Sequence, residues 1–433
     1  MSESAPADRT FATRSTPGLA PPAGLPDISR IEWWKGGQDD RVDAFAQIRA
    51  TPGLPKYPER VIEGNPLEPG PGYYVVTRHA DVWQASRNPQ LFCNGRGGFM
   101  IGDMENEMAE FYGSILAMDD PQHFRLRSIV SKGFTPRHIG AVGEQIERVA
   151  ARLVDRMIKE YPDRSADFVE VFSAPFPLEI ICSMMGIPPS DNQQILEWTN
   201  TILGLGDPEF VTSYEDLVNV GIAIFSYAQA LGEDRRTTPR DDITTALMHA
   251  EVDGERLTAQ EFGAFFILLV TAGNETTRNA ISHALKALTD HPDQRATWFG
   301  DYERHAKTAV EEIVRWASPV IHFRRTVTAD TELGGQQLHE GDKVILVYES
   351  ANRDPEVYPD PNTFDLTRPT NPAQVGFGAG GPHFCLGANL ARREITVAFD
   401  EIRRRLPDLR VTGEPDHLQS SFINGIKRLP CAW

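Results

Sequence analysis

The sequence predicts a mainly α fold with a minor β region, in which residues 31–433 form a single domain. From about residue 120 to 320, apolar residues recur with the 3.6-residue period of amphipathic helices. After Arg325, short segments rich in β-branched residues alternate with glycine turns. Since no linker separates the two kinds of sequence, we expect one domain although the chain has 433 residues.

Composition narrows the class of protein. Apolar residues make up 40% of the chain and charged residues 24%, which fits a globular protein, whereas the first 30 residues are rich in Pro, Ala, Ser and Thr and predict a flexible arm. This arm lacks the apolar core of a secretory leader, so we expect a cytoplasmic protein. The longest apolar run, Phe262–Gly273, is shorter than the ~20 residues of a membrane-spanning helix and predicts a buried helix. The net charge of −18 disfavours nucleic acids as partners, and four cysteines fit a reducing compartment.

The expected elements follow in chain order. Residues 72–77 predict a strand, 79–89 a helix, and the glycine-rich residues 93–102 a loop. Helical spacing then predicts helices over Arg137–Lys159, Pro177–Met185, Asp191–Leu203, Tyr214–Arg236 and Thr258–Asp290. The last begins with a capping box, Thr258 to Glu261, and ends before His291-Pro292. Residues 326–335 and 343–348 predict short strands, and a final helix follows Cys385.

The segment F-G-A-G-G-P-H-F-C-L-G, Phe377 to Gly387, is the strongest functional motif. Its four glycines allow the backbone to approach a flat cofactor closely. Cys385 stands where a helix is expected to begin, so free N–H groups and the helix dipole favour a thiolate there. A thiolate is a soft axial ligand suited to haem iron. We expect Cys93, Cys182 and Cys431 to be structural.

A second motif, A-G-N-E-T-T over Ala272–Thr277, lies in the middle of the long helix. Glycine inside a helix costs ~1 kcal/mol relative to alanine, and a threonine hydroxyl can bond the carbonyl four residues back and bend the helix. Together they predict a groove, beside which the Glu275 carboxyl and the Thr276 hydroxyl form a proton relay. The alternative is that Glu275 is an ordinary acid on a solvated helix face.

These motifs resemble those of the cytochrome P450 haem-thiolate family, in the family's order and from about residue 72 to the end. Glu312, Arg315 and Arg368 are similar to its structural salt-bridge triad. Phe377 stands one residue further from the cysteine than in the common bacterial pattern. This longer loop resembles that of mycobacterial sterol and branched-lipid hydroxylases. The extra residue leaves the packing of Phe377 open.

The resemblance implies the P450 fold, haem b as cofactor, Cys385 as the iron ligand, and Glu275 and Thr276 as the catalytic pair. Asp120-Pro121 predicts a helix start that places His123 and Arg127 on one face. By resemblance these two contact a haem propionate, as do Arg325 and His383. Arg324 competes with Arg325, which we prefer because residues 326–330 align with the usual strand. Further haem contacts are implied for Ala272, Gly273, Phe377, Gly378 and Gly387.

An apolar substrate pocket is expected on the distal side of the haem, lined by Phe99, Met100, Ile101, Leu203, Leu268, Thr271, Ala272, Val320, Phe422 and Ile423. Such a lining selects a long or bulky lipid by apolar burial. Several runs of the chain resemble mycobacterial methyl-branched lipid ω-hydroxylases. This implies O2-dependent, terminal hydroxylation of branched fatty acids, isoprenoids or sterol side chains.

No flavin or nicotinamide fingerprint is present, so we expect electrons to come from a ferredoxin and its reductase. We also expect the enzyme to be a monomer. A cationic patch for the ferredoxin is expected from Lys132, Arg137, Arg392, Arg393 and Arg403–Arg405. Solvated helix faces are the alternative reading of these cations.

Two other functions stay open. A peroxygenase would turn over with peroxide alone, and a non-catalytic haem carrier or sensor would form no product under a reconstituted electron supply.

Overall fold

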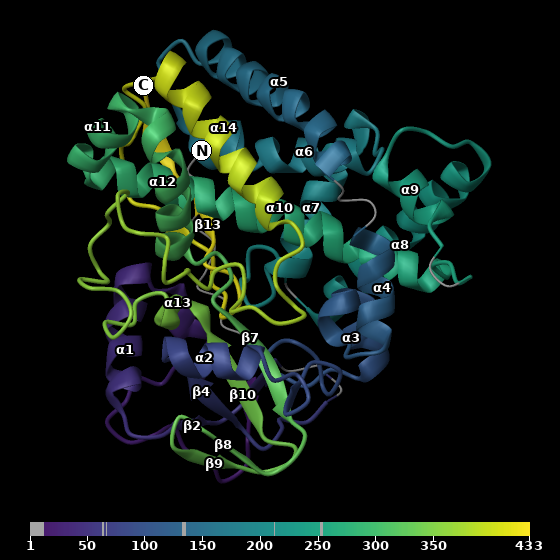
Figure 1. The fold of residues 1–433 in the computed structure, drawn as a ribbon, viewed down its shortest axis with the longest axis vertical. Coiled ribbons are helices and arrows are strands. Elements are labelled where there is room, and N and C mark those ends of the chain that lie inside the picture. The colour runs from purple at the N-terminus through teal and green to yellow at the C-terminus, as the bar shows by residue number, and fades with distance from the viewer. Residues whose placement is uncertain (1–12, 63–64, 66, 132–135, 212, 252–253) are drawn as a thin grey trace, which may run out of the picture.

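The computed structural model describes residues 13–62, 65, 67–131, 136–211, 213–251 and 254–433. A larger helical part adjoins a smaller part built around a sheet, with α1 and α2 beside that sheet (Figure 1). The helices are α1 Gln38–Ala50, α2 His79–Ser86, α3 Asn106–Gly113, α4 Gln122–Ser131, α5 Pro136–Glu160, α6 Pro175–Met184, α7 Asn192–Leu203, α8 Tyr214–Thr237, α9 Ile243–His249, α10 Ala259–Asp290, α11 Pro292–Gly300, α12 Tyr302–Ala317, α13 Tyr348–Ala351 and α14 Ala388–Arg405. The predicted helices are confirmed within a few residues at each end.

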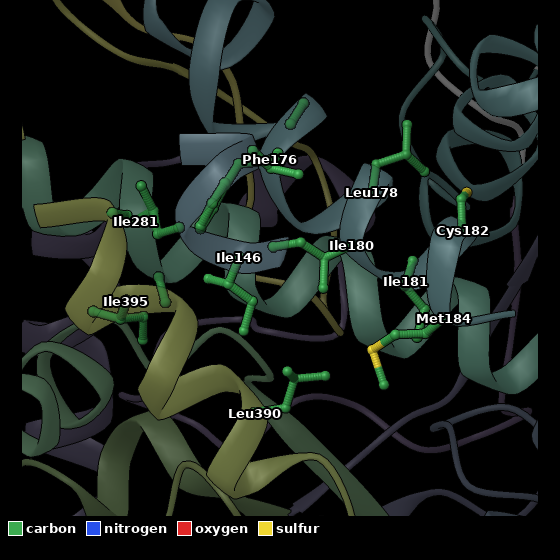
Figure 2. Packing of buried hydrophobic residues seen from close by; sticks show 14 of the residues in the cluster. Ile146, Phe176, Leu178, Ile180, Ile181, Cys182, Met184, Ile281, Leu390 and Ile395 are labelled. Carbon is green, nitrogen blue, oxygen red and sulfur yellow. The ribbon is translucent and has the colours of Figure 1, made fainter. Parts of the chain in front are cut away.

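The long helix α10 runs through the helical part and organises its core. The expected capping box is present: the Thr258 hydroxyl accepts a hydrogen bond from the Glu261 N–H at 3.1 Å, and the Glu261 carboxylate accepts one from the Thr258 N–H at 2.8 Å. Apolar side chains of α10 pack against α6 and α14, as Figure 2 shows for Ile281 between Phe176 and Ile395. A helix buried on most of its surface is a rigid support for a site at its middle.

The main sheet carries the second part of the fold. Its strands lie in the order β2 (Lys56–Tyr57), β4 (Tyr73–Val76), β10 (Lys343–Val347), β7 (His322–Val327), β5 (Phe92–Cys93), with β10 parallel to β4 and antiparallel to β7. The smaller sheets pair β1 (Thr13–Ser15) with β3 (Arg60–Ile62), β8 (Thr331–Leu333) with β9 (Gln336–Leu338), β12 (Asp416–His417) with β13 (Ile426–Arg428), and β14 (Pro430–Ala432) with both β11 (Arg410–Val411) and β6 (Ser165–Asp167). Because side chains alternate along β7, Arg324 and Arg325 point to opposite faces.

The N-terminal arm differs from its expectation. From residue 13 it is packed onto the sheet part: β1 pairs with β3, the Thr16 hydroxyl donates to the Gly70 carbonyl at 2.8 Å, and Ile28 is buried. Composition predicted flexibility because it does not reveal these long-range partners. Residues 1–12 lie outside the described residues. No helix in the described part of the chain is both long enough and apolar enough to cross a membrane.

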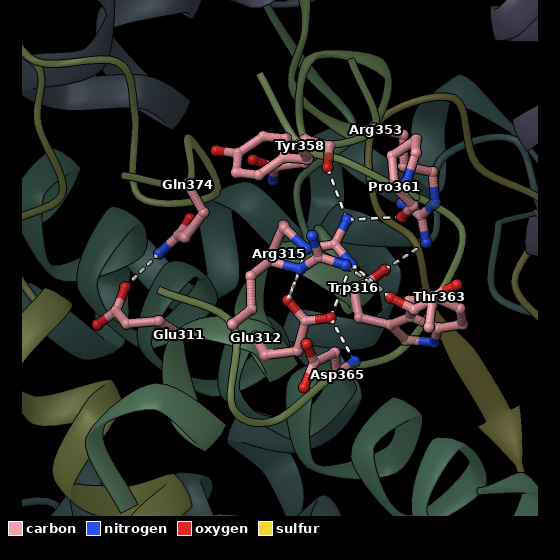
Figure 3. A network of polar contacts seen from close by, with 12 residues as sticks. Glu311, Glu312, Arg315, Trp316, Arg353, Tyr358, Pro361, Thr363, Asp365 and Gln374 are labelled. Carbon is pink, nitrogen blue, oxygen red and sulfur yellow. Dashed lines mark hydrogen bonds and ion pairs between the residues drawn. The ribbon is translucent and has the colours of Figure 1, made fainter. Parts of the chain in front are cut away.

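A buried ion-pair network joins α12 to the segment before the cysteine loop (Figure 3). Arg315 donates two hydrogen bonds to the Glu312 carboxylate, at 2.7 and 2.8 Å, and Arg368 lies 3.2 Å from the same carboxylate. Arg315 also donates to the carbonyl of Asn352, whose side chain accepts from the Val375 N–H at 2.8 Å. The predicted triad is therefore present, and it fixes the start of the cysteine loop.

Candidate active site

A cavity with an empty volume of about 1300 Å³ lies between α10, the cysteine loop and the start of α14. Its exposed lining is mostly apolar. The walls include Ile115, Leu116, Ile181, Phe265, Leu268, Leu269, Ala272, Gly273, Thr276, Val320, Phe323, Phe377, Cys385 and Leu390. The predicted cysteine and the predicted middle of the long helix thus belong to one cavity.

The cysteine loop presents the Cys385 thiol to this cavity. The Cys385 N–H donates to the Phe377 carbonyl at 2.9 Å, which folds the loop back on itself, and Gly378 adopts a φ of +93° at the bend. Cys385 lines the cavity and is exposed within it. The open question of Phe377 is answered, because its ring also lines the cavity and lies 4.4 Å from the Arg392 guanidinium.

The sequence predicts that all four loop glycines allow close approach to a cofactor, but only two of them serve that role. Gly378 and Gly387 line the cavity, but Gly380 and Gly381 pack against α2. A Cβ on Gly381 would overlap the Ser86 carbonyl oxygen. These two glycines therefore seat the loop on a neighbouring helix.

The expected thiolate stabilisation is present but outweighed. Backbone N–H groups of Gly387 and Ala388, together with Arg127 and Arg392, lower the pKa of Cys385, yet burial raises it above its ordinary value by more. Helix-start N–H groups alone thus leave the free thiol protonated. A bound cation is what favours the thiolate in such surroundings.

On the opposite wall, α10 carries Ala272 and Thr276 of the second motif. The Thr276 hydroxyl donates to the Ala272 carbonyl at 2.8 Å, and both residues line the cavity. Phe265, Leu268, Ala272 and Thr276 recur at helical spacing along this wall. Phe265 escaped the sequence prediction, although this spacing identifies it.

Glu275 points to a different place. Its carboxylate accepts a hydrogen bond from Arg278 at 2.6 Å and lines a separate, small cavity that also includes Asn200 and Asn279. The two predicted relay residues are therefore adjacent in the chain but face different cavities. Glu275 is buried, so the alternative of a solvated acid is wrong.

Glu394 on α14 is a buried acid that the sequence prediction missed. It lines the main cavity, and burial raises its pKa to about 8, against a smaller opposing effect of a hydrogen bond with the Thr277 hydroxyl. It is four residues from Leu390, on the apolar face of α14, and this position could have revealed it.

Cationic and imidazole groups gather at one side of the cavity. The rings of His123 and His383 lie 4.3 Å apart, and His123 Nε2 and His383 Nδ1 are buried without a hydrogen-bond partner among the described residues. Arg127 lines the cavity and donates to the Phe384 carbonyl at 2.6 Å. Burial lowers the pKa of His123, against a smaller opposing effect of its hydrogen bond with Asp120.

Arg325 does not line the cavity: its guanidinium donates to the Arg324 carbonyl at 2.8 Å, and its charge lowers the pKa of His383, after the larger effect of burial. Arg324 is instead ion-paired with Asp103 at 2.8 Å, on the other face of β7. Helix α4 begins at Gln122, so Pro121 precedes the first helical position, which is displaced by one residue from its expected place. The Asp120 carboxylate lies 3.2 Å from His123 Nδ1.

These residues fit a haem. Unpartnered buried imidazole nitrogens suit the carboxylates of its edge, the apolar walls suit its ring, and the accessible sulfur of Cys385 suits its iron.

Seven of the ten expected substrate residues do not line this cavity. Leu268, Ala272 and Val320 do, but Met100 lines a second cavity, Leu203 the small one, and the Thr271 hydroxyl is bonded to the Ile267 carbonyl. Phe99 and Phe422 pack together in a separate apolar cluster with Ile423, and Phe323 lies between them and the main cavity. Ile101 lines the second cavity.

The expected cationic patch is neutralised within the chain. Each described member has an acidic partner: Arg392 with Glu311, Arg393 with Glu147, Arg403 with Asp400, Arg404 with Glu401 and Arg405 with Asp155. Lys132 and the side chain of Arg137 lie outside the described residues. The described arginines therefore provide no excess positive charge to attract an acidic partner.

Comparison with known proteins agrees with this site. Residues 306–406 match the cytochrome P450 family model. A methyl-branched lipid omega-hydroxylase of Mycobacterium tuberculosis is 50% identical over 98% of both chains, and a steroid C26-monooxygenase of Mycolicibacterium smegmatis is 41% identical over 82% of both chains. A Mycobacterium marinum cytochrome P450 solved in complex with pseudoionone superposes with a TM-score of 0.89, at 38% identity, and covers 96% of this chain and 100% of its own. The chain belongs to the cytochrome P450 family and is a haem-dependent monooxygenase.

Proposed function

We propose that this monooxygenase hydroxylates the terminal carbon of a lipophilic chain, such as a methyl-branched fatty acid, an isoprenoid or a sterol side chain. The observation that carries the proposal is the apolar lining of the cavity between Cys385 and Thr276. A lining of this kind binds substrate by apolar burial, with the reacting chain end on the α10 side of the cavity, opposite the Cys385 sulfur. The relatives named for branched-lipid and steroid hydroxylation support the same chemistry.

The cofactor in this proposal is haem b, with Cys385 as its iron ligand. His123, Arg127, Arg325 and His383 hold the haem carboxylates, since Arg127 and His383 line the cavity while the His123 ring and the charge of Arg325 act on His383. When bound, the haem supplies the activation of O2 that allows one oxygen atom to enter a C–H bond.

The proton steps fall to α10. The Thr276 hydroxyl faces the cavity and orients the proton donors there, while Glu275 resupplies protons from the small cavity on the other side of the helix. For this transfer the Glu275 carboxylate has to turn away from Arg278, to which it is now bonded. Arg278 thus sets how readily Glu275 delivers a proton.

Electrons come from a ferredoxin and its reductase, because the sequence carries no flavin- or nicotinamide-binding pattern of its own. The enzyme acts as a cytoplasmic monomer. Since the arginines near α14 are ion-paired, we expect ferredoxin docking to depend only weakly on ionic strength.

The test is a spectral titration of the purified holoprotein with a branched fatty acid, an isoprenoid and a sterol, followed by product analysis with a surrogate ferredoxin and reductase. We expect a substrate-induced shift of the haem spectrum and a terminal alcohol as the main product. Absence of a shift with every lipid, or hydroxylation at internal carbons only, contradicts the proposal. Equal product from peroxide without ferredoxin identifies a peroxygenase instead.

A further inference from the structure

Arg392, near the start of α14, places a cation against an aromatic ring of the cysteine loop. Its guanidinium lies over the Phe377 ring, 4.4 Å from the ring centre, and both Phe377 and Cys385 line the main cavity. The Cys385 N–H also donates to the Phe377 carbonyl at 2.9 Å, so ring and sulfur belong to one tightly folded loop. The negative face of the ring attracts the guanidinium and keeps its charge close to this loop.

Glu311 on α12 fixes the orientation of Arg392. Two nitrogens of the Arg392 guanidinium donate to the Glu311 carboxylate, the second at 3.3 Å. The same carboxylate accepts a hydrogen bond from Gln374 Nε2 at 2.9 Å, which Figure 3 shows, and the Gln374 side chain accepts one from the Gly376 N–H. Because two bonds to one carboxylate fix a planar guanidinium, the position of the Arg392 charge is set by α12 and by the start of the cysteine loop.

The charge of Arg392 reaches the Cys385 sulfur. Burial raises the pKa of the Cys385 thiol, whereas the Gly387 N–H and the charges of Arg127 and Arg392 lower it. Arg127 lines the cavity and is assigned to a haem carboxylate, but Arg392 is not among the described lining residues. The Arg392 charge therefore acts on the sulfur through the electric field, without a bond to a group in the cavity.

The ion pair of Arg392 and Glu311 has no net charge, but its positive end is the one that lies over the cavity-lining ring. Reduction of a haem iron adds one electron, and so one negative charge, without breaking a bond. A positive charge near the thiolate stabilises the reduced form more than the oxidised form, and it weakens the electron donation of the sulfur to the iron. Both effects raise the reduction potential.

We propose that Arg392, oriented by Glu311 and by the Phe377 ring, raises the reduction potential of the haem by holding a positive charge beside the Cys385 thiolate. This inference rests on the proposed ligand role of Cys385. It goes beyond the proposed function, because it assigns control of electron uptake to an ion pair of this chain. Arg392 is then a positioning residue that acts through the sulfur and does not touch the substrate.

The test is a redox titration of the holoprotein with dithionite and mediators, followed through the haem absorbance and without ferredoxin. Arg392→Gln leaves the Glu311 charge unpaired, and we expect the one-electron reduction equilibrium to fall about threefold to tenfold, where tenfold is about 59 mV. Glu311→Gln leaves the Arg392 charge unpaired, and we expect the potential to rise. Arg392→Lys keeps the cation and should restore most of the potential that Arg392→Gln loses.

Arg393→Gln is the matched control. Arg393 is the next residue of α14, and its guanidinium is ion-paired with Glu147 on α5. The substitution removes the same charge from the same helix and leaves the contact between Arg392 and Phe377 in place. We expect this variant to have the reduction potential of the wild type.

Opposite shifts in Arg392→Gln and Glu311→Gln support the inference, because a loosened loop would move both potentials in the same direction. Shifts of the same sign, an unchanged potential in Arg392→Gln, or an equal shift in Arg393→Gln overturn it. The inference and its basis fail separately. A reduced carbon-monoxide complex without the red-shifted Soret band overturns the ligand role of Cys385, whereas a red-shifted band with unshifted potentials overturns the inference alone.

Discussion

Replacing Glu312 with glutamine removes the negative charge at the centre of the network that fixes the cysteine loop. The side chains of Glu312 and Arg315 are 1% and 2% exposed, so water cannot compensate the charge left on Arg315. Arg315 keeps its bonds to backbone carbonyls, but Arg368 loses its acidic partner as well. Breaking one side of a buried ion pair costs about 3–5 kcal/mol. Domains are commonly stable by about 5–15 kcal/mol, so this is a large part of the total.

The assay is denaturant unfolding of the holoprotein, followed through the haem absorbance. Glu144→Gln is the control, because Glu144 forms an ion pair with Arg148 on an exposed face of α5, where such pairs contribute about 0.3–0.5 kcal/mol. We expect a large loss of stability and of haem content for Glu312→Gln, and almost none for the control. A loss below about 1 kcal/mol for Glu312→Gln would refute the reasoning that burial makes this pair indispensable.

Three further outcomes are expected. Thr276→Ala should lower product formed per O2 consumed and raise peroxide release, measured against substrate hydroxylation; unchanged coupling contradicts the proton role of the hydroxyl. The pKa of the Glu394 carboxyl is raised to about 8 in the folded chain. The stability that this carboxyl contributes is therefore lost as the pH rises from the ordinary pKa of a glutamate towards 8, and Glu394→Gln should flatten the pH dependence of the free energy of unfolding over that range. An unchanged slope contradicts this. Gly381→Ala should lower haem retention because its Cβ overlaps the Ser86 carbonyl, whereas Gly335→Ala, where the space is open, should retain haem; equal retention contradicts the packing role.

The helices and the central motifs were predictable because their determinants are local. The capping box at Thr258, the proline after His291 and the 3.6-residue period fix α10 from the sequence alone. The position of Cys385 before α14 is likewise predicted by the residues next to it in the sequence. Local sequence is sufficient where backbone hydrogen bonds close within a few residues.

The unpredicted features depend on partners that are distant in the sequence. Gly381 is needed because a Cβ there would overlap the Ser86 carbonyl on α2, and the residues near Gly381 in the sequence do not predict that contact. Phe99 and Phe422 have apolar side chains that suit a substrate pocket, yet they pack on each other and on Phe323. Arg393 looks like part of a docking surface until the fold places Glu147 beside it.

The central claim is that the Cys385 sulfur holds the haem iron as a thiolate, and the carbon-monoxide spectrum of the reduced protein tests it most directly. The wild type should show the strongly red-shifted Soret band of thiolate coordination, and Cys385→Ser should lose that band. A colourless wild type, or a variant with the same red-shifted band, would contradict the account.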